Sequence, residues 1–413
     1  MLSTMRGNKN DVGRGILPGS FFYKPRSVAV LILVLTLINA GSLRTFYKYT
    51  PYPIIGFTGF ILLLVSIWLY LFKNNRINSV PTRGMLFCLA LAVLYIYPIA
   101  DALKYSMRGS DQDDCVRMLV HNYLSGDFSY TPSYLGNPCS TGPAEFFVYL
   151  PVAIWDNFFA VVPCITLISA YFVAAGLKGR EFAQILILGQ LSCLSFYEIS
   201  AAGSDFIPIG WAYTIGILLA LKAGRENLAS AVASIVALAI FSASRTPLFF
   251  LSLPVVGILF VARQKRAVTL ISFSLIISLG LYVSAYLLSG GVYAPLHLFH
   301  KALLLLSGGL GVKFLFLFVA LVLSMFLYYH YRSNNNLKFY LTALKTRILL
   351  VANASLVIPM FVIALADLAK RNFDFGQWEG ANYIIVGLPS LLVMLLDMRE
   401  FKSSDGVLQN APV

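Results

Sequence analysis

Charged residues are scarce in this chain. Of its 413 residues, 12% are charged and 58% are hydrophobic, and the mean hydropathy is +0.77. Repeated apolar runs take the place of the alternating polar faces that a soluble domain needs. The composition excludes a soluble globular protein. It predicts an all-α polytopic membrane protein, because a helix satisfies its own backbone hydrogen bonds in lipid.

Cysteine is rare, and familiar catalytic motifs are missing. Five cysteines are too few for a disulfide scaffold, and Cys88, Cys164 and Cys193 lie inside apolar runs. There is no Walker A sequence, no CxxC pair, no HExxH and no GxSxG. No repeat at a fixed period and no inverted duplication of the halves is evident, which weakens a transporter interpretation.

The apolar runs predict about twelve transmembrane helices. We expect a cytoplasmic tail over 1–26, a transmembrane domain over 27–397 and a second cytoplasmic tail over 398–413. The expected spans are 27–43, 52–71, 85–103, 157–177, 182–196, 206–221, 227–242, 247–261, 268–288, 313–331, 348–366 and 383–396.

Basic residues between the spans orient the chain. When the loops alternate, the basic connections at 73–83, 177–181, 221–226, 262–266 and 332–347 all fall on one side. The positive-inside rule places that side, with both termini, in the cytoplasm. The same rule explains the net charge of +13 without a nucleic-acid partner. We expect a multi-pass protein of a bacterial inner membrane with a periplasmic outer face; an endoplasmic reticulum protein is the alternative.

Most acidic residues fall on the outer side in this topology. Acids hardly influence topology, so their bias favours a functional group of carboxylates over simple solvation of loop ends. The outer acids are Asp101, Asp111, Asp113, Asp114, Asp127, Glu145, Asp156, Glu198, Asp205, Asp367, Asp374 and Glu379.

The longest polar passage belongs to the outer loop 104–156, which we expect to be catalytic. Asp111, Asp113 and Asp114 crowd the first turn of a predicted amphipathic helix that ends near Gly126. Acids at a helix start are ordinary, but three in four positions repel one another, which suits a general base. The apolar stripe of this helix predicts that it lies on the membrane surface.

The second half of this loop, SYTPSYLGNPCSTGP, is rich in Tyr, Pro and Gly. The rings of Tyr130 and Tyr134 offer faces on which sugars could stack. Cys115 and Cys139 share the loop, so they would form one disulfide if it faces an oxidising compartment.

This order of features resembles the GT-C superfamily of membrane glycosyltransferases, which use polyprenyl-phosphate-linked sugars as donors. In the aminoarabinose and protein mannosyl transferases, Asp-Glu precedes Gly-Asp-Trp by about fifteen residues. Here Asp111-Gln112 precedes Gly126-Asp127-Phe128 by fifteen, and Tyr134-Leu135-Gly136-Asn137-Pro138 would match a later Gly/Pro-containing stretch.

Two departures limit the resemblance. Gln112 replaces the usual second acid, which leaves open which carboxylate is the base. Two spans precede the one that normally opens the fold, which leaves membership open. The resemblance implies Asp111 as the base, with Asp113 and Asp114 in reserve. It implies substrate contacts at Asp127, Tyr130, Tyr134 and Asn137.

Other outer segments add candidate substrate contacts. Glu198 and Asp205 flank a turn similar to the Gly-Ser/Asn-Asp turn of some GT-C members, although Asp205 could simply cap a helix. Arg245 is a candidate phosphate ligand or else a snorkelling arginine. The segment 289–312 could be re-entrant or mobile and carries His300 and Lys301. Arg371 and Asp374 lie in a late stretch that mixes charge with aromatic residues.

Together these features predict an inverting glycosyltransferase. Its partners would be a polyprenyl-phosphate-linked sugar donor, a glycan or lipid acceptor and membrane lipids. We expect no cofactor; Asp111-Gln112-Asp113 is formally a DxD sequence, so a divalent metal stays open but is not favoured. The alternatives are an O-antigen-type polysaccharide polymerase or ligase, and a lipid-linked glycan transporter.

Overall fold

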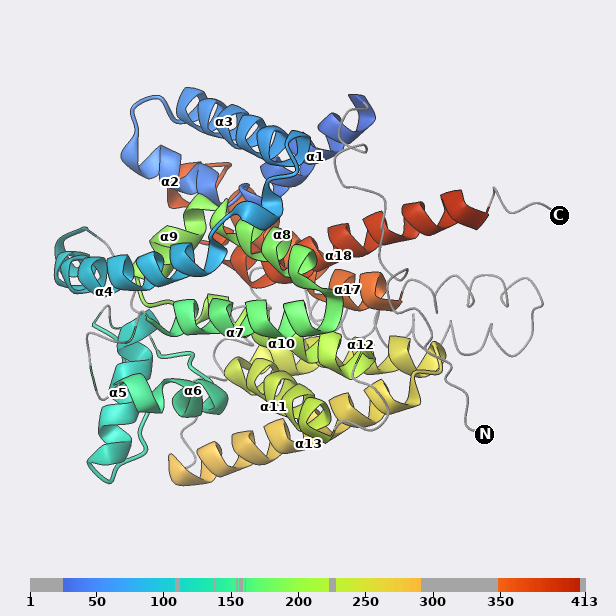
Figure 1. The fold of residues 1–413 in the computed structure, drawn as a ribbon. Coiled ribbons are helices and arrows are strands. Elements are labelled where there is room, and N and C mark those ends of the chain that lie inside the picture. Colours follow the sequence, from blue (N-terminus) through green and yellow to red (C-terminus); the bar gives the residue numbers. More distant parts are fainter. Residues whose placement is uncertain are drawn as a thin grey trace, which may run out of the picture.

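The described part of the chain is a bundle of α-helices without strands, seen in a computed structural model (Figure 1). The structure describes residues 25–107, 112–134, 136, 138–153, 155, 159, 161–222, 228–290 and 348–408. The helices are α1 (Pro25–Ile38), α2 (Ser42–Tyr49), α3 (Pro53–Lys73), α4 (Thr82–Met107), α5 (Gln112–Leu124), α6 (Pro143–Ala153), α7 (Val161–Lys178), α8 (Arg180–Leu191), α9 (Leu194–Ala201), α10 (Phe206–Lys222), α11 (Leu228–Ser244), α12 (Thr246–Val261), α13 (Lys265–Leu288), α17 (Ile348–Lys370) and α18 (Ala381–Leu408), with short 3-10 turns η2 (Ile77–Ser79) and η5 (Phe375–Gln377).

Several helices are long and apolar enough to cross a membrane. Five pass this test alone: α3, the part of α4 up to Leu103, α7, α13 and α17. Two bent pairs, α1 with α2 and α8 with α9, would bring the number to seven. Four shorter apolar helices lie in α10, α11, α12 and α18. The prediction of a polytopic helical membrane protein is therefore supported.

The predicted number of twelve spans is not confirmed. The predicted span 313–331 lies outside the described residues, and the spans 27–43 and 182–196 each cross a sharp bend between two helices. The other predicted spans overlap single helices, but several of these helices are short for a bilayer. The expected C-terminal tail from 398 does not begin at a helix end, because α18 continues to Leu408. Most of the tail 1–26 and of the segment 289–312 also lies outside the described residues.

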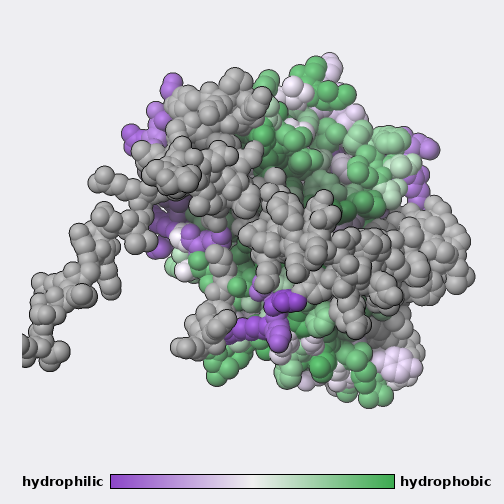
Figure 2. All heavy atoms as spheres, turned by 90° about the vertical axis from the view of Figure 1, so that its right-hand side faces the viewer, coloured by the Kyte–Doolittle hydropathy of each residue, from purple (hydrophilic) through white to green (hydrophobic). Residues whose placement is uncertain are grey.

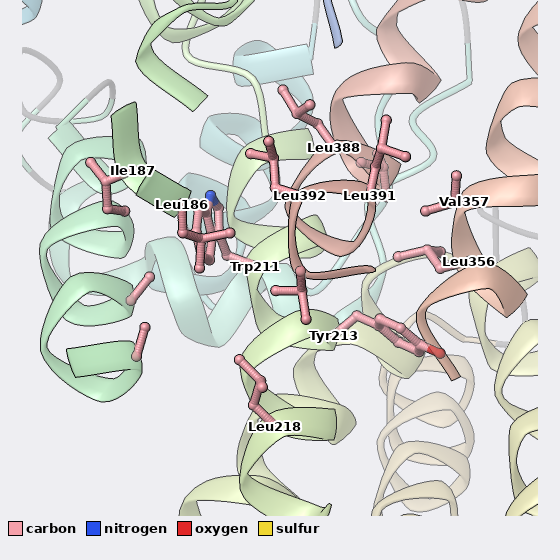
Figure 3. Packing of buried hydrophobic residues seen from close by; sticks show 14 of the residues in the cluster. Leu186, Ile187, Trp211, Tyr213, Leu218, Leu356, Val357, Leu388, Leu391 and Leu392 are labelled. Atoms are coloured by element: carbon pink, nitrogen blue, oxygen red, sulfur yellow. The ribbon is translucent and has the colours of Figure 1, made fainter. Parts of the chain in front are cut away.

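Helix α10 lies at the centre of the bundle. It packs against α7, α11, α13, α17 and α18. Trp211 and Tyr213 on α10 are almost fully buried and meet leucines of α8, α17 and α18 in the main core (Figure 3). The Tyr213 hydroxyl donates to the carbonyl of Ala352 on α17, so its one polar atom is satisfied.

Many large hydrophobic side chains are exposed on the surface of the bundle. Figure 2 views the bundle from the side away from α5 and shows hydrophobic side chains around separate hydrophilic patches. Large residues of α3 and α4, such as Ile55, Leu62, Phe87 and Tyr95, are exposed. Such a surface is expected where lipid replaces water.

Several acidic side chains gather at one end of the bundle. This end, called the α5 end here, carries α5 and α6 and lies on the left of Figure 1. Asp101 and Asp367 lie near the C-terminal ends of α4 and α17, and Asp205 directly precedes α10. Basic residues occur at both ends: Arg245 pairs with Asp205 at the α5 end, and Lys178 and Lys265 mark the other end. The side of the membrane that each end faces stays a prediction.

Helix α5 differs from its prediction in one respect. Its stop is as expected, since the helix ends at Leu124 and Gly126 follows with φ +85°. Its apolar stripe, however, does not face lipid: Val116, Leu119 and Val120 are buried in a second, smaller core with Tyr97, Phe146, Tyr149 and Phe159. An amphipathic stripe looks the same in sequence whether lipid or protein covers it, and here protein does.

A close helix crossing gives a test of this packing. A Cβ added to Gly210 on α10 would overlap the carbonyl oxygen of Val386 on α18. We expect Gly210→Ala to destabilise the protein by about 1–3 kcal/mol, because overpacking forces the two helices apart. Thermal unfolding in detergent measures the loss. Gly59→Ala on α3, where a Cβ meets open space, is the matched control; equal melting temperatures for the two variants would contradict the crossing.

Candidate functional site

Three aspartates converge at the α5 end. Asp101 comes from the last turns of α4, and Asp113 and Asp114 lie in the first turn of α5. One carboxylate oxygen from each lies within 4.8 Å of the others. We call these three residues the carboxylate cluster. The helix dipole favours anions in the first turn of α5, which offsets part of their mutual repulsion.

Two further side chains hold this cluster in place. The Tyr97 hydroxyl on α4 donates to Asp113 Oδ2 at 2.8 Å, and Asp113 is 1% exposed. Arg117, one turn along α5, contacts Asp101 Oδ2 at 3.2 Å in a half-buried ion pair. Helices α4 and α5 are therefore joined by polar contacts at the point where the acids meet.

The cluster has the chemistry of a proton acceptor or of a cation site. Clustered carboxylates favour binding of a proton, and their oxygens are the ligands that hard divalent cations prefer. The sequence predicted Asp113 and Asp114 as possible bases, and the structure brings both together with Asp101. Asp111, the first choice for the base, lies outside the described residues.

A second polar group lies deeper at the same end. Arg245, the residue before α12, contacts Asp205 Oδ2 through Nε at 3.1 Å and also through a terminal nitrogen. Its Nε lies 3.6 Å from Glu145 Oε1 on α6, and a guanidinium nitrogen donates to the Ser140 hydroxyl. We call Glu145, Asp205 and Arg245 the Arg245 cluster. All three are buried.

These contacts change the interpretation of Arg245. The guanidinium is 5.1 Å above the Phe206 ring and is surrounded by its own carboxylates, so its described partners are internal. A phosphate would have to displace Asp205 or Glu145 to bind there. The predicted phosphate contact stays a prediction, whereas the ion pair with Asp205 is a feature of the structure.

One turn connects the two clusters. Gly203, between α9 and α10, has φ +65°, and a Cβ there would lie 3.2 Å from Asp113 Cβ and 3.0 Å from Tyr97 Cε2. Asp205 follows two residues later. A movement of this turn would therefore reach both the carboxylate cluster and the Arg245 cluster.

The loop between α5 and α6 is tied at both ends. Cys115 and Cys139 form a disulfide, as the sequence predicts, across 24 residues. Three residues after Cys139, the Gly142 amide donates to the Ser244 carbonyl at 2.7 Å. The disulfide thus fixes the loop to α5, and the Gly142 bond fixes it to the end of α11.

Other predicted contacts in this loop are local. Asp127 accepts a hydrogen bond from Ser129 at 2.9 Å. Tyr130 packs edge-on against Phe128 in the smaller core, and Tyr134 is half-buried. Asn137 lies outside the described residues.

The remaining candidates form two polar groups away from α5. Glu198 on α9 accepts from Thr45 at 2.6 Å and lies 3.6 Å from Lys48 Nζ, both on α2. Arg371 pairs with Asp367 and Glu379 at 3.1 and 3.0 Å, and Asp374 accepts from the Gly376 amide. Glu198 thus joins α9 to α2, and Arg371 and Asp374 bond within the segment 367–379; none of these contacts involves the carboxylate cluster. His300 and Lys301 lie outside the described residues.

Sequence reasoning did not single out Tyr97 or Arg117, and it counted Asp101 and Glu145 only among the outer acids. A signal was present for the first two, because Tyr97 and Asp101 lie four apart on α4, and Asp113 and Arg117 four apart on α5. Such pairs share one helix face. Glu145 offered no local signal, since its partners Asp205 and Arg245 are far away in sequence.

The disulfide should be detectable directly. Peptide mass spectrometry without reduction should find Cys115 and Cys139 linked. Replacing both with Ser should lower the stability by about 3 kcal/mol, the chain-entropy value for a loop of this length. The exposed free thiol Cys88 supplies the control, as Cys88→Ser should leave stability nearly unchanged. Two free thiols in the native protein would refute the bond.

The turn between the clusters gives a second test. Gly203→Ala should destabilise the protein by about 1–3 kcal/mol, because the new methyl meets Phe159, Tyr97 and Asp113. Gly290 has the same φ of +65° but open space around it, so Gly290→Ala reports backbone strain alone. Melting temperatures of the two variants separate packing from strain. A Gly203→Ala variant as stable as Gly290→Ala would contradict the described contact.

Comparisons of the chain with known proteins gave no match. No family model, no curated protein and no solved structure matches the chain. The resemblance to the GT-C superfamily therefore rests on the sequence alone: the outer loop, the turn before Asp205 and the expected topology.

Proposed function

We propose that this protein is a membrane glycosyltransferase that moves a sugar from a polyprenyl-phosphate carrier to a hydroxyl of a glycan or lipid acceptor. The observation that carries the proposal is the carboxylate cluster. Asp101, Asp113 and Asp114 meet at one end of an apolar helical bundle, beside the helix start that Asp111 precedes. A sugar transfer to a hydroxyl is assisted by a general base, and a carboxylate can fill that role.

The proposed step is an inverting displacement. A carboxylate takes the proton of the acceptor hydroxyl while its oxygen forms a bond to the anomeric carbon. The bond from that carbon to the carrier phosphate breaks at the same time, and the electron pair leaves with the phosphate. The polyprenyl phosphate departs as a stable anion and needs no proton.

The described contacts suggest how the acids would divide this task. Asp113 accepts from Tyr97 and Asp101 pairs with Arg117, so both are held in position. Asp114 is less buried than Asp113. Among the described acids, Asp114 is therefore our first candidate for the base, and Asp101 and Asp113 would position it. The family resemblance independently favours Asp111.

The setting of the site supports membrane-bound substrates. It lies at the end of apolar helices, where a carrier lipid could keep its chain in the bilayer while its phosphate reaches the acids. The acidic end would face the periplasm of a bacterial inner membrane if the basic end is cytoplasmic.

One observation favours a second function, transport of a lipid-linked glycan. Transporters place charged residues inside the helix bundle, and such residues are expensive there. The Arg245 cluster is buried between α6, α10 and α12. A charged group in the interior is thus present, although it lies at the helix ends.

Substitution of the acids tests the proposal. Membranes containing the protein would be supplied with a panel of radiolabelled polyprenyl-phosphate hexoses, and released polyprenyl phosphate and labelled acceptor would be counted. Asp111→Asn or Asp114→Asn should slow transfer by about 10²–10⁴-fold, the usual contribution of a general base. Glu181→Gln, an acid at the opposite end of the bundle, should leave the rate unchanged.

Two outcomes would reject the enzyme. One is full activity in the Asn variants of Asp111, Asp113 and Asp114 at normal expression and melting temperature. The other is movement of labelled carrier across the membrane without release of polyprenyl phosphate, which would establish the transport function instead.

A further inference from the structure

The Arg245 cluster contains more buried negative charge than its arginine can balance. Glu145 is 2% exposed, Asp205 is 1% exposed, and both lie against one guanidinium. If both carboxyls were ionised, the cluster would carry a net negative charge away from water. A buried uncompensated charge of this kind is expensive, and proteins usually remove it by binding a proton.

The contacts differ between the two carboxyls. Asp205 receives two nitrogens of Arg245 on its Oδ2 atom. Glu145 has only the longer contact of 3.6 Å, and neither of its oxygens accepts a hydrogen bond from the described residues. Asp205 is therefore the carboxylate that pairs with Arg245. Glu145 is the carboxyl that receives no hydrogen bond from the described residues.

We propose that Glu145 and Asp205 form a buried proton-binding site in which Glu145 carries the proton and Asp205 carries the charge that pairs with Arg245. The ligand of this site is a single proton. It neutralises the cluster, and it lets Glu145 act as a hydrogen-bond donor toward the neighbouring carboxylate. The proposal does not depend on the sugar-transfer function.

The surroundings agree with this assignment. Burial raises the pKa of Glu145 well above its usual range, the nearby Asp205 raises it further, and Arg245 acts in the opposite direction. Other titratable groups in electrostatic range of the cluster are tyrosines, which are neutral at ordinary pH: Tyr149 on α6, Tyr282 on α13 and Tyr383 on α18. Tyr130, in the loop before α6, interacts with Tyr282. Among the described residues, Arg245 is the cation that faces the two carboxyls.

The proton also has a mechanical role. Glu145 lies in the first turn of α6, directly after the loop that the disulfide and Gly142 anchor. Loss of the proton would place two repelling carboxylates between α6 and α10. The docking of the loop and α6 should therefore weaken as the pH rises through the pKa of Glu145.

Infrared spectroscopy of the protein in lipid nanodiscs tests the site. The wild-type protein should show the carbonyl stretch of a protonated carboxyl at neutral pH, where an ordinary glutamate is ionised. Glu145→Gln should remove the contribution of one carboxyl from this band, whatever the acids of the carboxylate cluster add to it. Glu379→Gln, which changes an exposed glutamate paired with Arg371, should keep the wild-type intensity. No such band in the wild type, or a band of unchanged intensity in Glu145→Gln, would overturn the proposal.

Stability against pH gives an independent measurement. The raised pKa means that the folded protein holds one more proton than the unfolded chain, from the ordinary carboxyl range up to the pKa of Glu145 in the fold. In this window the ratio of folded to unfolded protein should fall about tenfold per pH unit relative to Glu145→Gln, which mimics the protonated side chain. Glu379→Gln should follow the wild type. Parallel melting curves for wild type and Glu145→Gln across pH 5–9 would overturn the proposal.

Discussion

The buried ion pair between Arg245 and Asp205 joins the start of α12 to the start of α10. Its residues lie at the start of α10 and just before α12, and Glu145 adds the start of α6. Removing one partner of a buried pair leaves a charge unpaired at a cost of about 3–5 kcal/mol. Such a pair does little for stability compared with an apolar core, but it defines which helix ends must meet. The position of α6, and with it the loop that leads to the carboxylate cluster, depends on this meeting.

The two clusters are arranged at different depths of one end of the molecule. The carboxylate cluster lies between α4 and α5, where Asp114 is only half-buried. The Arg245 cluster is enclosed by helices. Between the two clusters, the Phe159 ring stacks on the rings of Tyr149 and Tyr97, with centroids 4.5 Å and 6.3 Å apart. Gly203 lies against Phe159 and Tyr97. Aromatic packing of this type holds the neighbouring carboxylates in a fixed geometry, as the proposed sugar transfer would require.

Much of the fold was predictable because apolar length and charge sorting are local properties of a sequence. The apolar helices, the helix that follows Asp111 and the disulfide all follow from short stretches. The long-range pairs were not predictable, since Asp205 and Arg245 are 40 residues apart and nothing local indicates that α10 and α12 start side by side. For the same reason Arg245 was expected to meet a phosphate and not a carboxylate. The burial of α5 was missed because lipid and protein select the same apolar stripe.

The shortness of the central helices has a consequence for the bilayer. Helices α10, α11 and α12 have 17, 17 and 16 residues, so they are about 24–26 Å long at 1.5 Å per residue. A hydrocarbon core is about 30 Å thick. Lipid would have to thin to match such helices, unless protein covers their ends. Helix α6 packs on the end of α11 and on α13, and so replaces the missing thickness. Protein at the α5 end would then compensate the hydrophobic mismatch of these short helices, in place of a thinned bilayer.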